Sequence, residues 1–415
     1  MLMDNLAEHM ESFFEAELDE RDMLTASGNR ERIPGPRPAG KDPLQANAAR
    51  RRERAPAGNG AGRGRQRGSV LPFAPGQKVS TPASIPGFDV RIASRRCKSP
   101  WEEMPAALRA YDRIIEYMHR TVSFTHLGAL NFSAIEDVLV ELVGSLRNNM
   151  DVLISIPRIV QRDNYLYTHS ANVSILLAAF ALCCGKGEQE ALLAAQAGLL
   201  FDLGKTLLPK SLLHSNRKLT ETEQSLVRRH PLLGHNLLVE KIAKAPPWVL
   251  SAALEHHERF DGSGYPRGIA GSAISDIGHL AAIADTYDAL VSRRLYREAL
   301  SPSQALGLMY RRRESDYHAD FLSLFIRMVG IYPVGSIVQL RDGYRGVVTG
   351  SNISNPLKPR VMLVMDANGL AMPHIECDLA RDDVADIVRC LKPEETGIHP
   401  HQILGFFTSA YPGAG

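Results

Sequence analysis

Residues 256–266 read His-His-Glu-Arg-Phe-Asp-Gly-Ser-Gly-Tyr-Pro, and this stretch is the strongest indication of the fold. Its two histidines end an expected helix over 247–257, and the glycines and proline that follow predict a tight loop. Glycine and proline are useful in turns without any ligand. The loop Gly264-Tyr265-Pro266 therefore has two interpretations at this point, a turn that caps a pair of helices and a binding surface.

Apolar residues recur every three or four positions on both sides of this stretch, which predicts a mainly helical protein. The expected helices span 101–119, 132–161, 169–184, 188–203, 220–243, 247–257, 274–291 and 302–313. Thr220 and Glu223 predict a capping box at the start of one helix. After Pro333 the apolar period changes to two. Short strands are expected over 336–341, 346–350, 361–366 and 373–377, with a turn at Asp342-Gly343.

Histidines and aspartates gather at the ends of these expected helices or in the helix that follows the loop. They are His169, Asp202, His230, His256, His257 and Asp285. Imidazole and carboxylate together suit transition metals such as iron, manganese or zinc, and helical bundles direct such ligands inward from several helices. Spacing alone leaves two interpretations open, a metal site and a group of hydrogen-bonded histidines.

Three longer motifs surround these residues. Residues 200–209 read Leu-Phe-Asp-Leu-Gly-Lys-Thr-Leu-Leu-Pro, and residues 285–297 read Asp-Thr-Tyr-Asp-Ala-Leu-Val-Ser-Arg-Arg-Leu-Tyr-Arg. Together with 256–266, they resemble the HD-GYP family, helical metal-dependent phosphohydrolases that hydrolyse the bacterial messenger cyclic di-GMP. The resemblance covers roughly residues 165–313, and the piece that begins at 330–335 looks like an extension that many members carry.

The resemblance implies a role for each matching residue. The implied metal ligands are His169, Asp202, His230, His256, His257 and Asp285, with Asp202 bridging two ions. The implied catalytic residues are Asp202 and Lys205. The implied contacts to the substrate are Lys205, Asp288, Arg294 and Arg297. Lysine and arginine suit a phosphodiester anion, and Asp285 and Asp288 share a helix face. Gly264, Tyr265 and Pro266 match the loop linked to substrate and to protein partners such as GGDEF-type proteins.

The chain departs from the family at its His-Asp pair, which is Phe201-Asp202 here. Phenylalanine has no lone pair and cannot bind a metal. The resemblance then implies one ion held by Asp202, His230, His256 and His257. The second ion keeps His169, Asp202 and Asp285 and loses its fourth ligand. Tyr165 stands where some members carry a glutamate for a further, optional ion.

Two functions follow from this departure. The first is a cyclic di-GMP phosphodiesterase, producing pGpG or GMP, that is weakened because its class uses two ions. The alternative is a catalytically degenerate sensor or adaptor that keeps the nucleotide pocket and acts through protein contacts. A water molecule that fills the vacant ligand position would preserve activity, because catalytic metals tolerate open positions.

The net charge of +2 hides two oppositely charged segments. Residues 1–22 hold eight acids and one base, and residues 29–69 hold eleven bases and three acids. Apolar residues within 4–20 fit either a short partner-binding helix or a solvated acidic tail. The Pro-, Gly- and Arg-rich stretch that follows predicts a disordered linker. Its arginines are not interleaved with aromatic residues, so nucleic acid is not expected as a partner.

These features predict a mainly α protein, an HD-type helical bundle with a small β-rich C-terminal subdomain. The expected divisions are a disordered arm over 1–87, a helical lead-in over 88–165, the HD-GYP helical domain over 166–330, the β-rich subdomain over 331–392 and a tail over 393–415. Five sparse cysteines predict reduced thiols. No signal peptide or membrane-spanning stretch is expected, and the predicted location is the cytoplasm.

Overall fold

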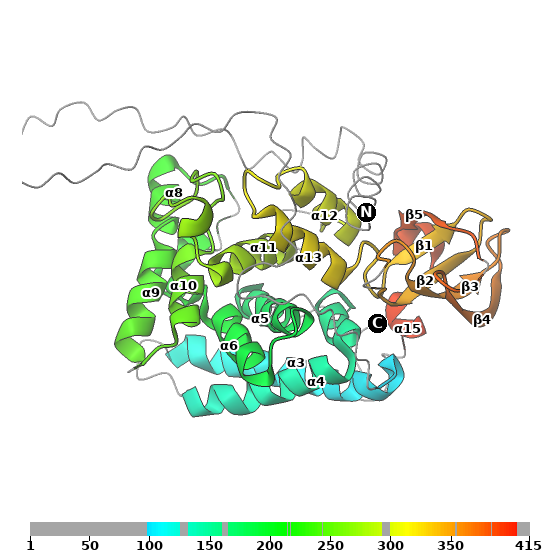
Figure 1. Cartoon of the computed structure of the whole chain (residues 1–415), viewed down its shortest axis with the longest axis horizontal. Helices are drawn as coiled ribbons and strands as arrows, with labels where there is room; N and C mark the ends of the chain where they lie inside the picture. The colour runs from blue at the N-terminus through cyan, green and yellow to red at the C-terminus, as the bar shows by residue number, and fades with distance from the viewer. Residues whose placement is uncertain are drawn as a thin grey trace, which may run out of the picture. The chain divides into compact units, whose positions relative to one another are not determined.

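The structure is a computed structural model that describes residues 98–124, 132–159, 165–213, 215, 217–242, 244–292, 299–352, 355–382 and 384–404. These residues form helices up to Val329 and then a five-stranded sheet (Figure 1). The predicted fold class, a helical bundle followed by a small β-rich part, is confirmed. The predicted disordered arm over 1–87 lies outside the described residues.

Five of the described helices pack against α5. The described helices are α3 (Pro100–Phe124), α4 (Phe132–Ile159), α5 (Tyr165–Cys183), α6 (Glu188–Leu200), α7 (Lys210–Leu213), α8 (Glu221–Val227), α9 (His230–Lys241), α10 (Pro247–Glu255), α11 (Asp276–Val291), α12 (Pro302–Tyr310), α13 (Ala319–Val329), α14 (Pro393–Thr396) and α15 (Pro400–Ile403), with the 3-10 helices η2 (Leu203–Leu207) and η3 (Gly271–Ala273).

Helix α5 is buried on all sides from His169 to Ala181, because its sequence is apolar almost throughout. It packs against α3, α4, α6, α11 and α13 (Figure 1). A Cβ atom on Gly198 of α6 would lie 2.7 Å from the backbone of Ser174, so glycine allows α5 and α6 to approach closely. His169 is the fifth residue of this central helix.

The single helix expected over 220–243 is wrong, because the structure divides it into α8 and α9. Pro231 has no N–H and occupies the first turn of α9, where that donor would have no partner within the helix. The capping box of Thr220 and Glu223 is confirmed. The break places His230 at the beginning of a helix, facing the ends of other helices.

Helix α13 and the last strand are among the described elements that were not expected from the sequence. The strands are β1 (Ile337–Leu340), β2 (Arg345–Gly350), β3 (Arg360–Met365), β4 (Ala371–Asp378) and β5 (Ile387–Leu391). They form an antiparallel sheet in the order β4-β3-β2-β1-β5. The Asp151 carboxylate of α4 accepts hydrogen bonds from the Ser351 hydroxyl at 2.5 Å and from its backbone N–H at 3.1 Å.

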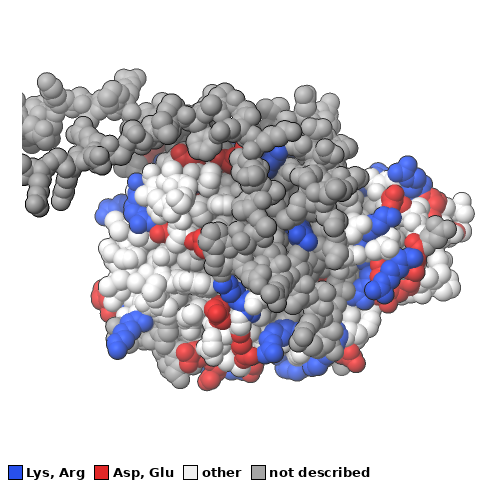
Figure 2. Space-filling view, in the orientation of Figure 1, with Lys and Arg blue, Asp and Glu red and all other residues white. Residues whose placement is uncertain are grey.

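The surface of the described residues carries mixed charge. On the face shown in Figure 2, basic and acidic side chains are interspersed. None of the helices in the described ranges has the length and apolar character needed to cross a membrane. Four described cysteines, Cys183, Cys184, Cys377 and Cys390, are free thiols.

Candidate metal centre

Asp202 and His230 meet because two backbones approach closely. Helix α6 ends at Leu200, and the chain turns through Phe201 and Asp202 into η2. A Cβ atom on Gly204 would lie 2.0 Å from the carbonyl oxygen of His230 and 2.5 Å from the Gly234 nitrogen, so only glycine fits. This contact brings Asp202 Oδ1 to 3.3 Å from His230 Nε2.

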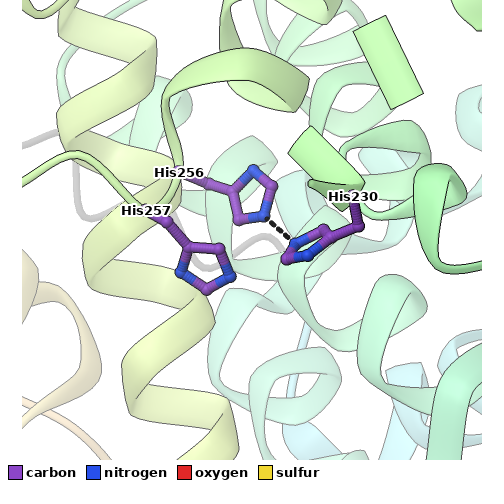
Figure 3. Close-up of side chains that lie close together, drawn as sticks. All are labelled: His230, His256 and His257. Carbon is purple, nitrogen blue, oxygen red and sulfur yellow. Dashed lines mark hydrogen bonds between the residues drawn. The ribbon is translucent and has the colours of Figure 1, made fainter. Parts of the chain in front are cut away.

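Backbone carbonyls fix the orientation of two imidazole rings. His230 donates its Nδ1–H to the Val227 carbonyl at 2.7 Å, and His256 donates its Nδ1–H to the Ala252 carbonyl at 3.0 Å. The Nε2 atoms of the two rings then carry lone pairs and lie 3.0 Å apart (Figure 3). Two lone pairs at this distance repel each other unless a proton or another cation lies between them.

The proton is disfavoured because the rings are buried away from water. Burial, followed by the charge of Lys205, lowers the pKa of His230 to about 3. Burial, followed by the neighbouring His230, lowers the pKa of His256 to about 4, and burial lowers the pKa of His257 well below its usual value. Ligand nitrogens of the three histidines lie within 4.8 Å of one another. Neutral imidazoles that converge in this way fit a metal cation.

The Asp202 carboxylate completes this group. It is buried, and within the described residues its oxygens accept no hydrogen bond of regular geometry. Lys205 Nζ nevertheless lies 2.5 Å from Oδ2. A buried carboxylate is stable when a cation compensates its charge. Asp202, His230, His256 and His257 together therefore form a donor set that fits a divalent transition metal.

His169 lies in a second group, where each of its two ring nitrogens forms a hydrogen bond with a carboxylate. Its Nε2 lies 2.9 Å from Asp285 Oδ1, and its Nδ1 lies 2.7 Å from Asp288 Oδ2. Burial opposes a charged ring, but these hydrogen bonds outweigh it and raise the pKa of His169 to about 9. Burial also favours a neutral Asp285, yet His169 and His257 hold the pKa of that carboxyl well below its usual range. An ion pair between His169 and Asp285 results.

Phe201 contacts both groups. It is fully buried, and its ring centroid lies 5.7 Å from the ring of His169 and 4.8 Å from the ring of His256. A hydrocarbon ring therefore occupies the position next to both groups where a ligand would be needed. Asp285 also connects the two groups, because its Oδ2 lies 3.8 Å from His257 Nδ1.

Comparisons with known proteins agree with this geometry. A family model described as HD domain matches residues 154–320, and one described as KOW domain associated with HD domain matches 337–398. The chain is 34% identical over 272 residues to the cyclic di-GMP phosphodiesterase PA4108 of Pseudomonas aeruginosa, covering 64% of either chain. Residues 154–320 of the chain thus match an HD domain. The resemblance to HD-GYP proteins is thereby confirmed.

Two further relatives match the chain over shorter stretches. The cyclic di-GMP phosphodiesterase response regulator RpfG of Xanthomonas campestris is 41% identical over 129 residues, covering 31% of this chain and 34% of that protein. The 3'3'-cGAMP-specific phosphodiesterase 2 of Vibrio cholerae is 33% identical over 158 residues, covering 38% and 30%. The chain thus spans 64% of the length of the first relative and about a third of the other two.

The glycine-rich loop lies directly against the candidate metal centre. A Cβ atom on Gly264 would lie 2.5 Å from the Glu258 Cα, so the loop needs glycine to pass this close. The Tyr265 N–H donates to the His257 carbonyl at 3.1 Å, and the Tyr265 ring stacks on the His257 ring at 4.7 Å between centroids. Pro266 follows in a cis peptide bond. The loop therefore covers one predicted ligand of the metal.

Buried carboxylates hold this loop in place. Glu258 accepts hydrogen bonds from the backbone N–H groups of Arg267 at 2.8 Å and Ile269 at 3.2 Å. Glu255 accepts from the Arg267 side chain at 2.6 Å. Neither glutamate was expected from the sequence to have a role, although Glu258 belongs to the motif over 256–266.

Of the other predicted substrate contacts, the structure describes only Asp288. The Asp288 carboxylate is buried, and besides His169 it accepts hydrogen bonds from Asn172 at 2.8 Å and Ser292 at 3.0 Å. These partners favour a role in orienting His169 over direct contact with substrate. Asn172 was missed, since nothing in its local sequence marks it. Arg294 and Arg297 lie outside the described residues.

Proposed function

We propose that this chain is a cyclic di-GMP signalling protein that binds the nucleotide at one divalent transition-metal ion and hydrolyses it slowly. Iron and manganese are the proposed metals, held by Asp202, His230, His256 and His257. The observation that carries the proposal is the pair of Nε2 lone pairs 3.0 Å apart in His230 and His256. Relatives named as cyclic di-GMP phosphodiesterases support this choice of substrate.

The chemistry of the centre divides between the ion and the protein. A divalent ion, when bound, polarises a phosphoryl oxygen and activates water for attack. Lys205 is partly exposed beside Asp202 and can neutralise a phosphate oxygen as negative charge develops. Tyr265 stacks on His257 and excludes water from one side of that ring. Asp288 and Asn172 orient His169.

The second ion is proposed to bind weakly or not at all, because its predicted ligands are bonded to each other and one ligand position holds Phe201. His169 is bonded to both Asp285 and Asp288, and Phe201 fills the adjacent position without offering a lone pair. Changes around a metal typically cost about 10- to 100-fold in affinity or activity. Cyclic di-GMP turnover is therefore proposed to be slow or below detection.

A second candidate function is nucleotide sensing without hydrolysis. It is favoured because the buried Phe201 fills a position of the second ion and offers no lone pair. A sensor needs the pocket and a surface for partners, not the second ion. The loop 264–266 is the proposed surface for protein partners such as GGDEF-type proteins, because it touches His257 and reaches solvent in part. The proposed location is the cytoplasm, as the sparse cysteines predict.

Metal analysis combined with a turnover assay tests the proposal. The purified chain is loaded with manganese or iron, and bound ions are counted by mass spectrometry. The cyclic di-GMP, pGpG and GMP present after incubation are separated by chromatography. We expect about one tightly bound ion and slow or undetectable loss of cyclic di-GMP. Two tightly bound ions together with fast turnover would refute the proposal. Binding of cyclic di-GMP without turnover would favour the sensing function over the phosphodiesterase.

A further inference from the structure

An arginine lies over the Tyr265 ring, beside the candidate metal centre. Arg228 follows the last residue of α8 and stands two positions before His230. Its guanidinium carbon lies 5.1 Å from the centre of the Tyr265 ring, and the same ring stacks on His257. Attraction between a guanidinium and an aromatic face holds the side chain in place. Arg228 is therefore oriented by a residue that touches a metal ligand.

This cation is available for an anionic ligand. Arg228 is exposed, and within the described parts of the chain no carboxylate lies within 4.0 Å of its guanidinium nitrogens. Figure 2 shows basic side chains at the surface beside α8. The neighbouring Arg259 differs, since it donates to the Glu258 carbonyl at 3.1 Å and lies 4.0 Å from Asp316. An oriented guanidinium without an acidic partner is suited to bidentate binding of a phosphate.

A cyclic dinucleotide supplies two phosphodiester groups, and only one of them can be at the metal and Lys205. The geometry points to Arg228 as the binding residue for the second, non-scissile phosphate of a cyclic dinucleotide. This inference rests on the proposed function. Arg228 then favours cyclic dinucleotides over mononucleotides, because a ligand with one phosphate gains nothing from this cation.

Replacement of Arg228 by glutamine removes the charge and keeps a side chain of similar length. Arg229→Gln is the matched control, because Arg229 is the next residue along the chain and is also exposed. Calorimetry measures the Kd of the manganese-loaded proteins for cyclic di-GMP and for GMP. Chromatography after each titration confirms that the nucleotide is intact.

The expected result is a Kd for cyclic di-GMP about tenfold higher in Arg228→Gln, as for one lost charged hydrogen bond. Arg229→Gln is expected to match the wild-type chain. The Kd for GMP and the number of bound manganese ions are expected to stay the same in both variants.

Three outcomes would overturn the inference. Equal Kd values for cyclic di-GMP in the wild-type chain and Arg228→Gln would show that Arg228 does not contact the nucleotide. A parallel loss of manganese would show that Arg228 only supports Tyr265 and His257. An equal loss of GMP binding would place Arg228 at the scissile phosphate. No binding of cyclic di-GMP by the wild-type chain would instead refute the proposed function itself, and this inference with it.

Discussion

Phe201→His supplies the imidazole that the second metal ion lacks. The centroid of the ring at position 201 lies 5.7 Å from that of His169 and 4.8 Å from that of His256. An imidazole at this position would therefore lie next to both predicted metal groups. A bound ion would compete with the proton of His169 for the carboxylate of Asp285. We expect the variant to bind a second manganese ion and to hydrolyse cyclic di-GMP at least tens of times faster.

The burial of Phe201 sets the cost of this change without metal. A fully buried phenylalanine contributes about 1.5–3 kcal/mol through its apolar surface. An imidazole that lacks partners in the same place adds a penalty of about 1–3 kcal/mol. The free energy of unfolding in EDTA is therefore expected to fall by about 2.5 to 6 kcal/mol. Manganese at about 100 times its Kd restores about 2.7 kcal/mol, which offsets the lower end of this range.

Three measurements check this prediction. Urea unfolding in EDTA and in manganese gives the two free energies, mass spectrometry gives the ions bound per chain, and chromatography gives turnover. Phe201→Leu is the control, because it removes the ring without adding a ligand. It is expected to lose stability and to gain neither an ion nor turnover. An ion count that stays at one, with the same loss of stability in EDTA and in manganese, would refute the reasoning.

Two further predictions concern the backbone and the effect of pH. Gly204→Ala places a methyl group 2.0 Å from the His230 carbonyl oxygen, so the unfolding free energy should fall by about 3 kcal/mol and metal binding should be lost. Gly144→Ala, in open space on a helix, should instead add about 0.5–1 kcal/mol, and equal effects would contradict the close approach. In EDTA the stability from His169, whose folded pKa is about 9, is present below pH 6.5 and is lost as the pH rises through 9. The stability from neutral His256, whose folded pKa is about 4, is present above pH 6.5 and is lost as the pH falls to 4. Urea unfolding from pH 4 to 9 tests both, and an unchanged alkaline slope in His169→Asn would contradict the first.

The sequence predicted which residues the structure brings together better than it predicted how they bond. The position of His256 and His257 at a helix end follows from the helical period, whereas His230 lay inside the single helix expected over 220–243. The pairing of His169 with two carboxylates could not be expected, since it depends on how α5 packs against α11. Asn172, three residues further along α5, was missed for the same reason.

Part of the fold was also missed, for identifiable reasons. The strand β5 lies at an edge and is half exposed, so its sequence lacks a clear alternation. The single helix expected over 220–243 ignored the proline in the first turn of α9. The contact between Gly204 and Gly234 joins segments that no local pattern relates. Tertiary packing decided each of these points.

The hydrogen bond from the Tyr265 N–H to the His257 carbonyl has a thermodynamic consequence. The loop 264–266 and a predicted metal ligand are parts of one connected segment, so they cannot shift independently. A protein that binds this loop and prefers one position of His257 must change the affinity of the chain for its metal. By reciprocity, the metal changes the affinity for that protein by the same factor. The amount of bound metal would then set how tightly such a protein binds the loop, even if no nucleotide were hydrolysed.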